Sequence, residues 1–209
     1  MNTILSFITP GDILIHIMSI AIANLEASID QVATLLNSGS IGIIPTDTVY
    51  GVVVCASDET AVKKLYSLKD RRRKPGTLIA ADRSQLLSLG VSDEFIAQVE
   101  RWWPGPLSAV LPMAGREYLH QGVGDIAMRI PDDPTISQLL LATGPLLTSS
   151  ANHPAQPGST TIQEAWNYFH DDVDFYVDGG DLSHRSPSTI IKPNGNGAIV
   201  LLRDGAIKI

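Results

Sequence analysis

The densest group of chemically capable side chains in this sequence is a basic run that follows a predicted helix. Residues 69–74, Lys-Asp-Arg-Arg-Arg-Lys, place five of the chain's 15 basic residues in six positions. One or two cations complement the negative end of a helix dipole, so five exceed that need. Lysine offers phosphate a point charge and arginine a bidentate fork. The run therefore predicts a bound polyanion, either a polyphosphate or RNA.

Two clusters of small polar side chains, mostly hydroxyls, accompany the basic run. Thr46, Asp47 and Thr48 lie between apolar segments, and Gly51, just beyond them, allows a ligand close to the backbone. Residues 148–152, Thr-Ser-Ser-Ala-Asn, follow an apolar strand, and ligands of open α/β sheets bind at the carboxyl ends of strands. Both patterns are also typical of ordinary polar turns, whose side chains bond their own backbone. The spacing alone leaves both explanations open.

Two arginines end predicted strands, while most standard cofactor motifs are absent. Arg129 lies at the end of strand 126–130, and Arg203 follows the apolar run 199–202. The sequence has no GxxxxGK[ST], GxGxxG or GxSxG motif. Its five histidines lack metal-ligand spacing and its one cysteine, Cys55, cannot form a thiolate zinc site. We therefore predict no metal-ligand set, and any nucleotide site must be of an unusual kind.

Helices and strands that must position these residues alternate along the chain. Hydrophobic periodicity and end signals predict helices at 25–36, 58–68, 92–103, 134–143 and 162–169, and strands at 41–45, 49–55, 77–81, 107–112, 126–130, 146–149, 189–191, 198–202 and 206–209, with a further one around Tyr176. Asp133-Pro134 is a typical helix start, and Thr161 with Glu164 fits a capping box. The irregular alternation predicts a single α/β domain with a twisted, mixed parallel and antiparallel sheet and flanking helices.

Composition and charge narrow the class of protein. A chain of 209 residues suits one domain, and 15 basic against 22 acidic residues give a net charge of −7, unfavourable for indiscriminate nucleic-acid binding. A single cysteine suits a reducing compartment, so we expect a cytoplasmic protein. Residues 1–17 are apolar but too interrupted for a membrane span or a signal peptide. They are either an extension before a start at Met18 or an edge strand, and the domain is expected over 18–209.

Taken in order, these segments resemble the YrdC-like family, whose best-known members are threonylcarbamoyl-AMP synthases. The resemblance covers about residues 22–203. The matching motifs are Pro45–Gly51, Lys69-x-Arg71, Trp103–Leu107, Arg129-x-Pro131, Ser150-x-Asn152, and Ser188-Thr189-Ile190 followed by Arg203. Each motif is weak alone, but six in the right order are specific.

The resemblance implies a YrdC-like fold with a concave basic ligand cavity, and an enzyme that joins L-threonine, bicarbonate or CO2 and ATP into threonylcarbamoyl-AMP, releasing pyrophosphate. ATP with Mg2+ is a substrate, and no tightly bound cofactor is expected. Transferase proteins then carry the threonylcarbamoyl group to adenosine 37 of tRNAs that read ANN codons, the t6A modification. The implied site has Lys69 and Arg71 as catalytic and ATP-binding residues, Ser150, Asn152 and Arg203 as further ATP contacts, and Thr46, Thr48, Arg129 and Thr148 around threonine.

Departures from the family pattern keep alternatives open. Asp133-Pro134 stands where His-Pro is common, and Pro154-Ala155 replaces the usual Ser-Gly. The segment 74–78, Lys-Pro-Gly-Thr-Leu, resembles the YciO-like branch, whose role is less secure. One alternative is therefore a paralogue that binds nucleotide without robust synthase activity. Another is an RNA-binding protein with weak affinity for tRNA or double-stranded RNA. No general base is evident, so positioning in a closed cavity would carry much of the catalysis.

Overall fold

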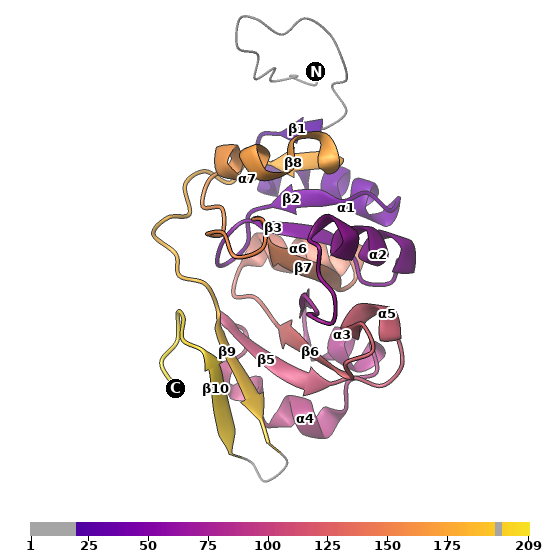
Figure 1. Cartoon of the computed structure of the whole chain (residues 1–209), viewed down its shortest axis with the longest axis vertical. Coiled ribbons are helices and arrows are strands. Elements are labelled where there is room, and N and C mark those ends of the chain that lie inside the picture. Colours follow the sequence, from indigo (N-terminus) through magenta and orange to yellow (C-terminus); the bar gives the residue numbers. More distant parts are fainter. Residues whose placement is uncertain (1–19, 195–197) are drawn as a thin grey trace, which may run out of the picture.

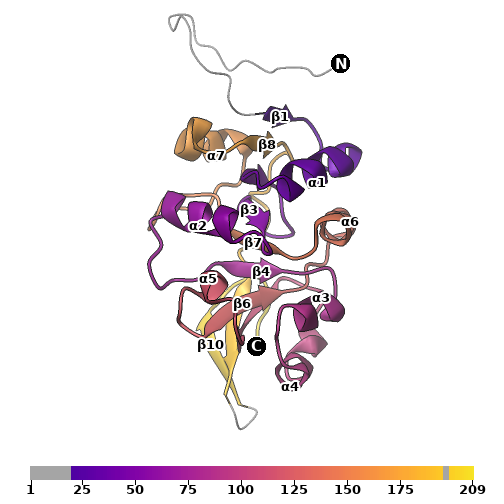
Figure 2. The same ribbon diagram turned by 90° about the vertical axis from the view of Figure 1, so that its right-hand side faces the viewer.

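The computed structural model describes residues 20–194 and 198–209, which fold around one strongly twisted sheet (Figures 1 and 2). Residues 1–17, with their two alternative expectations, lie outside the described residues. Within the described ranges the strands are β1 Ile20–Ile22, β2 Gly42–Ile44, β3 Gly51–Cys55, β4 Thr77–Ile79, β5 Leu107–Pro112, β6 Asp125–Arg129, β7 Leu146–Ser150, β8 Phe175–Val177, β9 Thr189–Pro193 and β10 Ile199–Arg203.

The sheet is mixed, as the irregular alternation of elements predicts. The strands lie in the order β1-β8-β2-β3-β7-β4-β6-β5-β9-β10. Neighbours β1/β8, β2/β8, β4/β6 and β5/β9 are parallel, and the other pairs are antiparallel. A line of directly paired residues crosses five strands of the sheet. It passes from Val53 in β3 to Thr148 in β7, Thr77 in β4, Ala127 in β6 and Val110 in β5. This line brings distant sequence segments to one part of the sheet.

Helices flank both faces of the sheet. Those of the described chain are α1 Ile29–Asn37, α2 Glu59–Leu68, α3 Arg83–Ser88, α4 Asp93–Ala97, α5 Glu117–His120, α6 Pro134–Thr143 and α7 Ile162–Phe169. The predicted caps are confirmed: the Asp133 carboxylate accepts from the amides of Thr135 and Ile136 at the start of α6, and Thr161 with Glu164 closes a capping box on α7. Such caps satisfy amides that a helix leaves without an internal partner.

Two apolar cores lie on opposite faces of the sheet. α1 and α6 pack together over one face, with Leu36 and Leu139 fully buried. The larger core forms on the other face under α2 and α7, around residues such as Leu65 and Phe169. Figure 2 shows α1 and α6 lying on the opposite side of the strands from α2 and α7. The strands between these layers are consequently held rigid from both sides.

Local expectations fail mainly at short or terminal elements. The strand predicted at 206–209 is wrong, because this segment is irregular: the Thr189 hydroxyl donates to the Ile207 carbonyl and accepts from the Ile207 amide, outside any ladder. The helix predicted at 92–103 is broken into α4 and a 3-10 turn at Glu100–Trp102. The short helices α3 and α5, and strand β1, have no distinct periodic signal, since each spans at most six residues.

Candidate active site

A cavity of about 890 Å³ extends across the sheet from β3 to β10. Its strand residues come from β3, β7, β4, β6, β5, β9 and β10, which are consecutive in the sheet. Eight of the nine residues predicted for the site lie in its wall: Thr46, Thr48, Arg71, Arg129, Thr148, Ser150, Asn152 and Arg203. Lys69 is the ninth, and it is not part of the wall. The twisted sheet therefore gathers segments that are far apart in the sequence.

Thr46 and Thr48 form a short hydrogen-bonded turn at one end of the cavity. The Thr46 hydroxyl donates to the Val49 carbonyl at 2.6 Å and accepts from the Thr48 amide at 3.2 Å. Because its only hydrogen is committed to Val49, the 3.1 Å contact between the two hydroxyls has Thr48 as donor. Thr48 Oγ1 consequently keeps a lone pair for an incoming N–H group. The turn is internally satisfied yet offers an acceptor to a ligand.

Glycine at position 51 permits a close approach between this turn and β7. A Cβ at Gly51 would lie 2.5 Å from Thr148 Oγ1, well inside contact distance. Gly76 has a similar role on the other side of β7, where a Cβ would lie 2.6 Å from the Thr148 carbonyl oxygen. Thr148 is buried between them. The two glycines let three chain segments meet around Thr148, one at its hydroxyl and one at its carbonyl.

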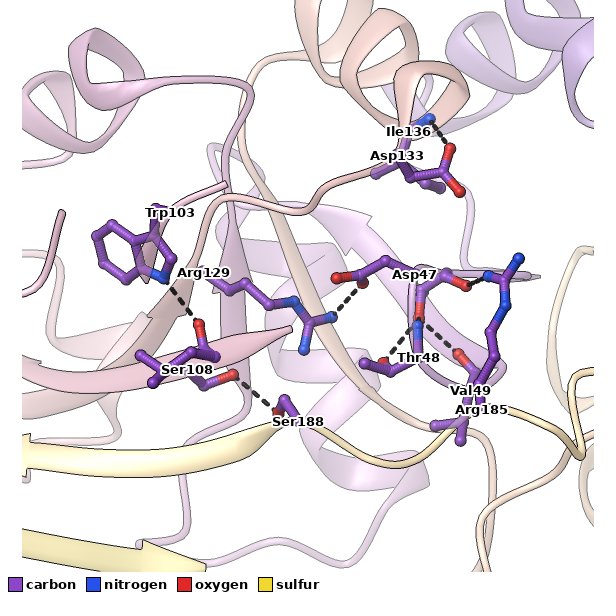
Figure 3. A network of polar contacts seen from close by, with 12 residues as sticks. Asp47, Thr48, Val49, Trp103, Ser108, Arg129, Asp133, Ile136, Arg185 and Ser188 are labelled. Carbon is purple, nitrogen blue, oxygen red and sulfur yellow. Dashed lines mark hydrogen bonds and ion pairs between the residues drawn. The ribbon is translucent and has the colours of Figure 1, made fainter. Parts of the chain in front are cut away.

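Arg129 reaches this end of the cavity from the last position of β6 and is held by Asp47. Its Nη2 lies 2.9 Å from Asp47 Oδ1, and each side chain is 5% exposed. Figure 3 shows the Asp47 carboxylate turned toward Arg129, with Arg185 on the opposite side of the Thr48 backbone. Burial raises the pKa of Asp47, and Asp133 adds to the rise, although Arg129 and Arg185 oppose it. Burial also lowers the pKa of Arg129, which Asp47 counteracts.

Several buried polar atoms here have no hydrogen-bond partner among the described residues. They include Asp47 Oδ2, Arg129 Nε and Ser149 Oγ. Buried polar groups are nearly always satisfied in folded proteins. Arg129 and Ser149 both line the cavity. A ligand carrying oxygen acceptors would supply the missing partner of Arg129 Nε, which makes this end of the cavity suited to a carboxylate.

Lys69 lies behind the wall of the cavity. Its ammonium group donates to the Ser150 carbonyl at 2.8 Å, to the Asn152 carbonyl, and to Asn152 Oδ1 at 3.3 Å. It also faces the Phe169 ring at 5.4 Å. Burial, helped by the nearby Arg71, lowers the pKa of Lys69 to about 7. Lys69 therefore ties the end of α2 to the Ser150–Asn152 turn, with no carboxylate at its side among the described residues.

Cations dominate the charged part of the cavity wall. Five cationic side chains line it: Arg71, Arg129, Arg185, Lys192 and Arg203. The wall has one carboxylate among the described residues, Asp125, and that group is 2.6 Å from Lys192 Nζ. Arg203 donates twice to the Ser188 carbonyl, at 2.6 and 3.1 Å. Burial lowers its pKa, as does the proximity of Arg129.

Two residues of the site, Arg185 and Lys192, escape prediction from sequence, and so does the ion pair of Asp47. Asp47 belongs to a recognised motif, but its partner Arg129 is known only once β6 is placed beside β4. Arg185 comes from an irregular loop with no periodic signal, and its guanidinium donates to the Thr46 carbonyl at 2.6 Å. Thr46 and Arg185 also line a smaller cavity of about 330 Å³. Lys192 is an unremarkable lysine in the sequence, and its role depends on β9 lying next to β5.

Two other kinds of feature are absent from the described residues. No helix there is long and apolar enough to cross a membrane. No group of three or more histidine, cysteine or acidic side chains in the same part of the chain could hold a metal ion.

Curated relatives align over most of this chain. A protein of Methanocaldococcus jannaschii named putative threonylcarbamoyl-AMP synthase is 32% identical over 180 residues, which cover 82% of this chain and 83% of the relative. A threonylcarbamoyl-AMP synthase of Stutzerimonas stutzeri is 30% identical over 167 residues, covering 78% of this chain and 90% of the relative.

Solved structures share the fold. P. abyssi Sua5 complexed with L-threonine superposes with a TM-score of 0.80 at 29% identity, and the match covers 90% of this chain and 58% of Sua5. E. coli YciO superposes with a TM-score of 0.78 at 24% identity, over 90% of this chain and 96% of YciO, which shows the fold alone. A sequence profile of the Sua5/YciO/YrdC family, described as "Telomere recombination", matches residues 34–205. This chain therefore belongs to the Sua5/YciO/YrdC family.

Proposed function

We propose that this protein synthesises threonylcarbamoyl-AMP from L-threonine, CO2 or bicarbonate and ATP, for the t6A modification of tRNA. The observation that carries the proposal is the convergence of eight predicted residues on one cavity, whose wall, as far as the structure describes the chain, has five cations and one carboxylate. The names of the relatives agree with it: two are threonylcarbamoyl-AMP synthases by name, and the Sua5 structure holds L-threonine.

The reaction has two bond-forming steps. The threonine amine attacks the carbon of CO2 and loses a proton, which gives an N-carboxylate. An oxygen of this carbamate then attacks the α-phosphorus of ATP, the bond from that phosphorus to the bridging oxygen breaks, and pyrophosphate leaves with the electron pair. Negative charge builds on the leaving group, so fixed cations stabilise the transition state.

The wall of the cavity divides into two subsites. Thr46, Thr48, Arg129 and Thr148 form the threonine end, where Arg129 faces the α-carboxylate and Thr48 Oγ1 accepts from the amine. Arg71, Ser150, Asn152 and Arg203 form the ATP end. Arg71 is anchored by its own donation to the Pro75 carbonyl at 3.0 Å, which leaves further N–H groups for phosphate. Lys69 contributes by holding the Ser150–Asn152 turn and lies close to the ATP subsite.

Magnesium fits as a partner of the nucleotide. Mg2+ keeps several waters and binds mainly through phosphate oxygens with one or two carboxylates. Asp125 is the wall's one carboxylate among the described residues, and it would have to exchange its ion pair with Lys192 for a contact to the ion. Bound to the triphosphate, the ion would neutralise part of its charge. We expect no tightly bound cofactor. The lone thiol of Cys55 is buried and free, which suits a reducing compartment, so we place the reaction in the cytoplasm.

Mass spectrometry of the product is the decisive experiment. The pure protein, incubated with ATP, Mg2+, bicarbonate and L-threonine, should form the adenylate and release pyrophosphate only when threonine is present. Absence of threonine-dependent pyrophosphate release across several Mg2+ and bicarbonate concentrations would refute the proposal and favour a nucleotide-binding paralogue. Tight tRNA binding that weakens steeply with salt, in a protein without turnover, would favour the RNA-binding alternative.

A further inference from the structure

The basic run 69–74 divides in the folded protein, and only part of it belongs to the cavity. Lys69 is buried behind the wall and Arg71 lies in it, whereas Arg72, Arg73 and Lys74 are exposed outside it. The side chains of these three residues form no ion pair or hydrogen bond with other described residues. The polyphosphate site therefore leaves three cations of the run without a use.

These three cations are presented on a firmly held backbone. The Gln121 side chain accepts from the Lys74 amide at 2.9 Å and donates to the Arg71 carbonyl at 2.9 Å. Arg73 has a φ of 54°, the left-handed region that non-glycine residues rarely adopt. Two hydrogen bonds from one glutamine thus span the loop and fix a conformation that an unrestrained chain would disfavour. The charges have a defined position beside the cavity.

An exposed apolar side chain lines the same cavity as the two ends of this loop. Val123, two residues after Gln121, is 42% exposed and lines the cavity. We call Arg72, Arg73, Lys74 and Val123 the rim patch, because Arg71 and Pro75, on either side of the three cations, also line that cavity. Arginine together with exposed apolar area is typical of protein interfaces. A mixed patch at the edge of a catalytic cavity suits a protein that takes up the product.

We propose that the rim patch docks an acidic surface of the threonylcarbamoyl-transferase that consumes the adenylate. The inference rests on the proposed function. A small acidic patch on a partner protein can bind the three cations and stay clear of the remaining surface of this chain, whose net charge is −7. An extended RNA would lie along more of that surface and be repelled by its negative charge. With three phosphate contacts, the logarithm of the RNA-binding constant would fall with the logarithm of the salt concentration with a slope of only about −3, and the affinity at physiological salt would be low.

Charge reversal tests the docking surface. The variant R72E/R73E/K74E should lower the association rate with the purified transferase of the same organism at least about tenfold at low salt. The difference should shrink as salt rises, because rim charges act mainly through steering. The control K63E/K64E/K208E reverses three cations that are 67%, 58% and 81% exposed and lie outside the cavity wall. This control should associate like the parent.

Two further measurements separate the proposal from its competitors. Threonine-dependent pyrophosphate release should stay within about twofold of the parent in the R72E/R73E/K74E variant, because none of the three residues lines the cavity. Its loss there would place the rim patch in the catalytic site and overturn the proposal, whereas its absence in the parent would refute the proposed function instead. No salt-dependent association of the parent with the transferase would also overturn it. So would a tenfold loss of binding to tRNA alone with unchanged transferase association, which would assign the patch to RNA.

Discussion

Replacing Asp47 with Asn and Arg129 with Met, singly and together, measures the coupling of the buried pair that holds the threonine subsite. The two groups are 2.9 Å apart, and each side chain is 5% exposed. With charge centres about 4 Å apart and an effective dielectric of about 20, their attraction is about 4 kcal/mol. Surface screening does not reduce this figure, since water barely reaches either group. We therefore expect a coupling free energy of about 4 kcal/mol.

The two single variants should lose different amounts of unfolding free energy. The pKa of Asp47 is raised, which means that burial destabilises the charged carboxylate by more free energy than the attraction to Arg129 restores. Asp47→Asn removes both the desolvation penalty and the attraction. Asp47→Asn should therefore lower the unfolding free energy by less than the coupling. Arg129→Met leaves Asp47 charged, buried and near Asp133, which costs about 3–5 kcal/mol. The double variant relieves that repulsion and should be less destabilised than the two losses added together.

Urea denaturation of the four proteins near neutral pH, with equal m-values, gives the coupling directly. A coupling below about 0.5 kcal/mol would mean additive effects and would refute the assignment of Asp47 as the partner that holds Arg129. A kinetic readout is independent of stability. Asp47→Asn should raise the KM for threonine and leave the KM for ATP unchanged, because the Asp47 carboxylate pairs with the Arg129 guanidinium at the threonine end.

Three further predictions test other parts of the site and core. Since the Lys69 pKa is about 7 in the fold against an ordinary 10.5, the native state releases a proton that the unfolded chain keeps, and the unfolding free energy should rise with pH from about 7 toward 10.5. Urea titrations of Lys69→Met should show no such rise. The same dependence of the unfolding free energy on pH in the variant as in the parent would contradict the lowered pKa of Lys69. Arg71→Ala should lose most ATP-dependent turnover, about a hundredfold, while the fold survives, as a cooperative urea transition would show; near-parental turnover would exclude Arg71 from the site. Gly42→Ala should destabilise by about 1–3 kcal/mol or more, because its Cβ would lie 2.0 Å from the Phe175 ring; an unchanged melting temperature would disprove that contact.

Local patterns in the sequence were sufficient for elements whose ends and faces are encoded nearby. Asp133-Pro134 and Thr161 with Glu164 start helices through hydrogen bonds to residues two or three positions away. The apolar strands could be found for the same reason, because burial on a sheet requires continuous apolar runs. The short helices could not, since each spans too few residues to show a period. The irregular segment 206–209 could not either, since its conformation depends on the long-range contact of Ile207 with Thr189.

The sequence by itself determined the α/β class and the order of the motifs, and the family that those motifs resemble implied eight of the residues that line the cavity. Only the tertiary structure decided what each charged side chain contacts. The Lys69 ammonium finds its partners 81 and 83 residues away, Asp47 meets Arg129 across the sheet, and the basic run splits between cavity and surface. The physical reason is that a buried charge must find a partner, and the sheet order determines which distant groups come within hydrogen-bond distance.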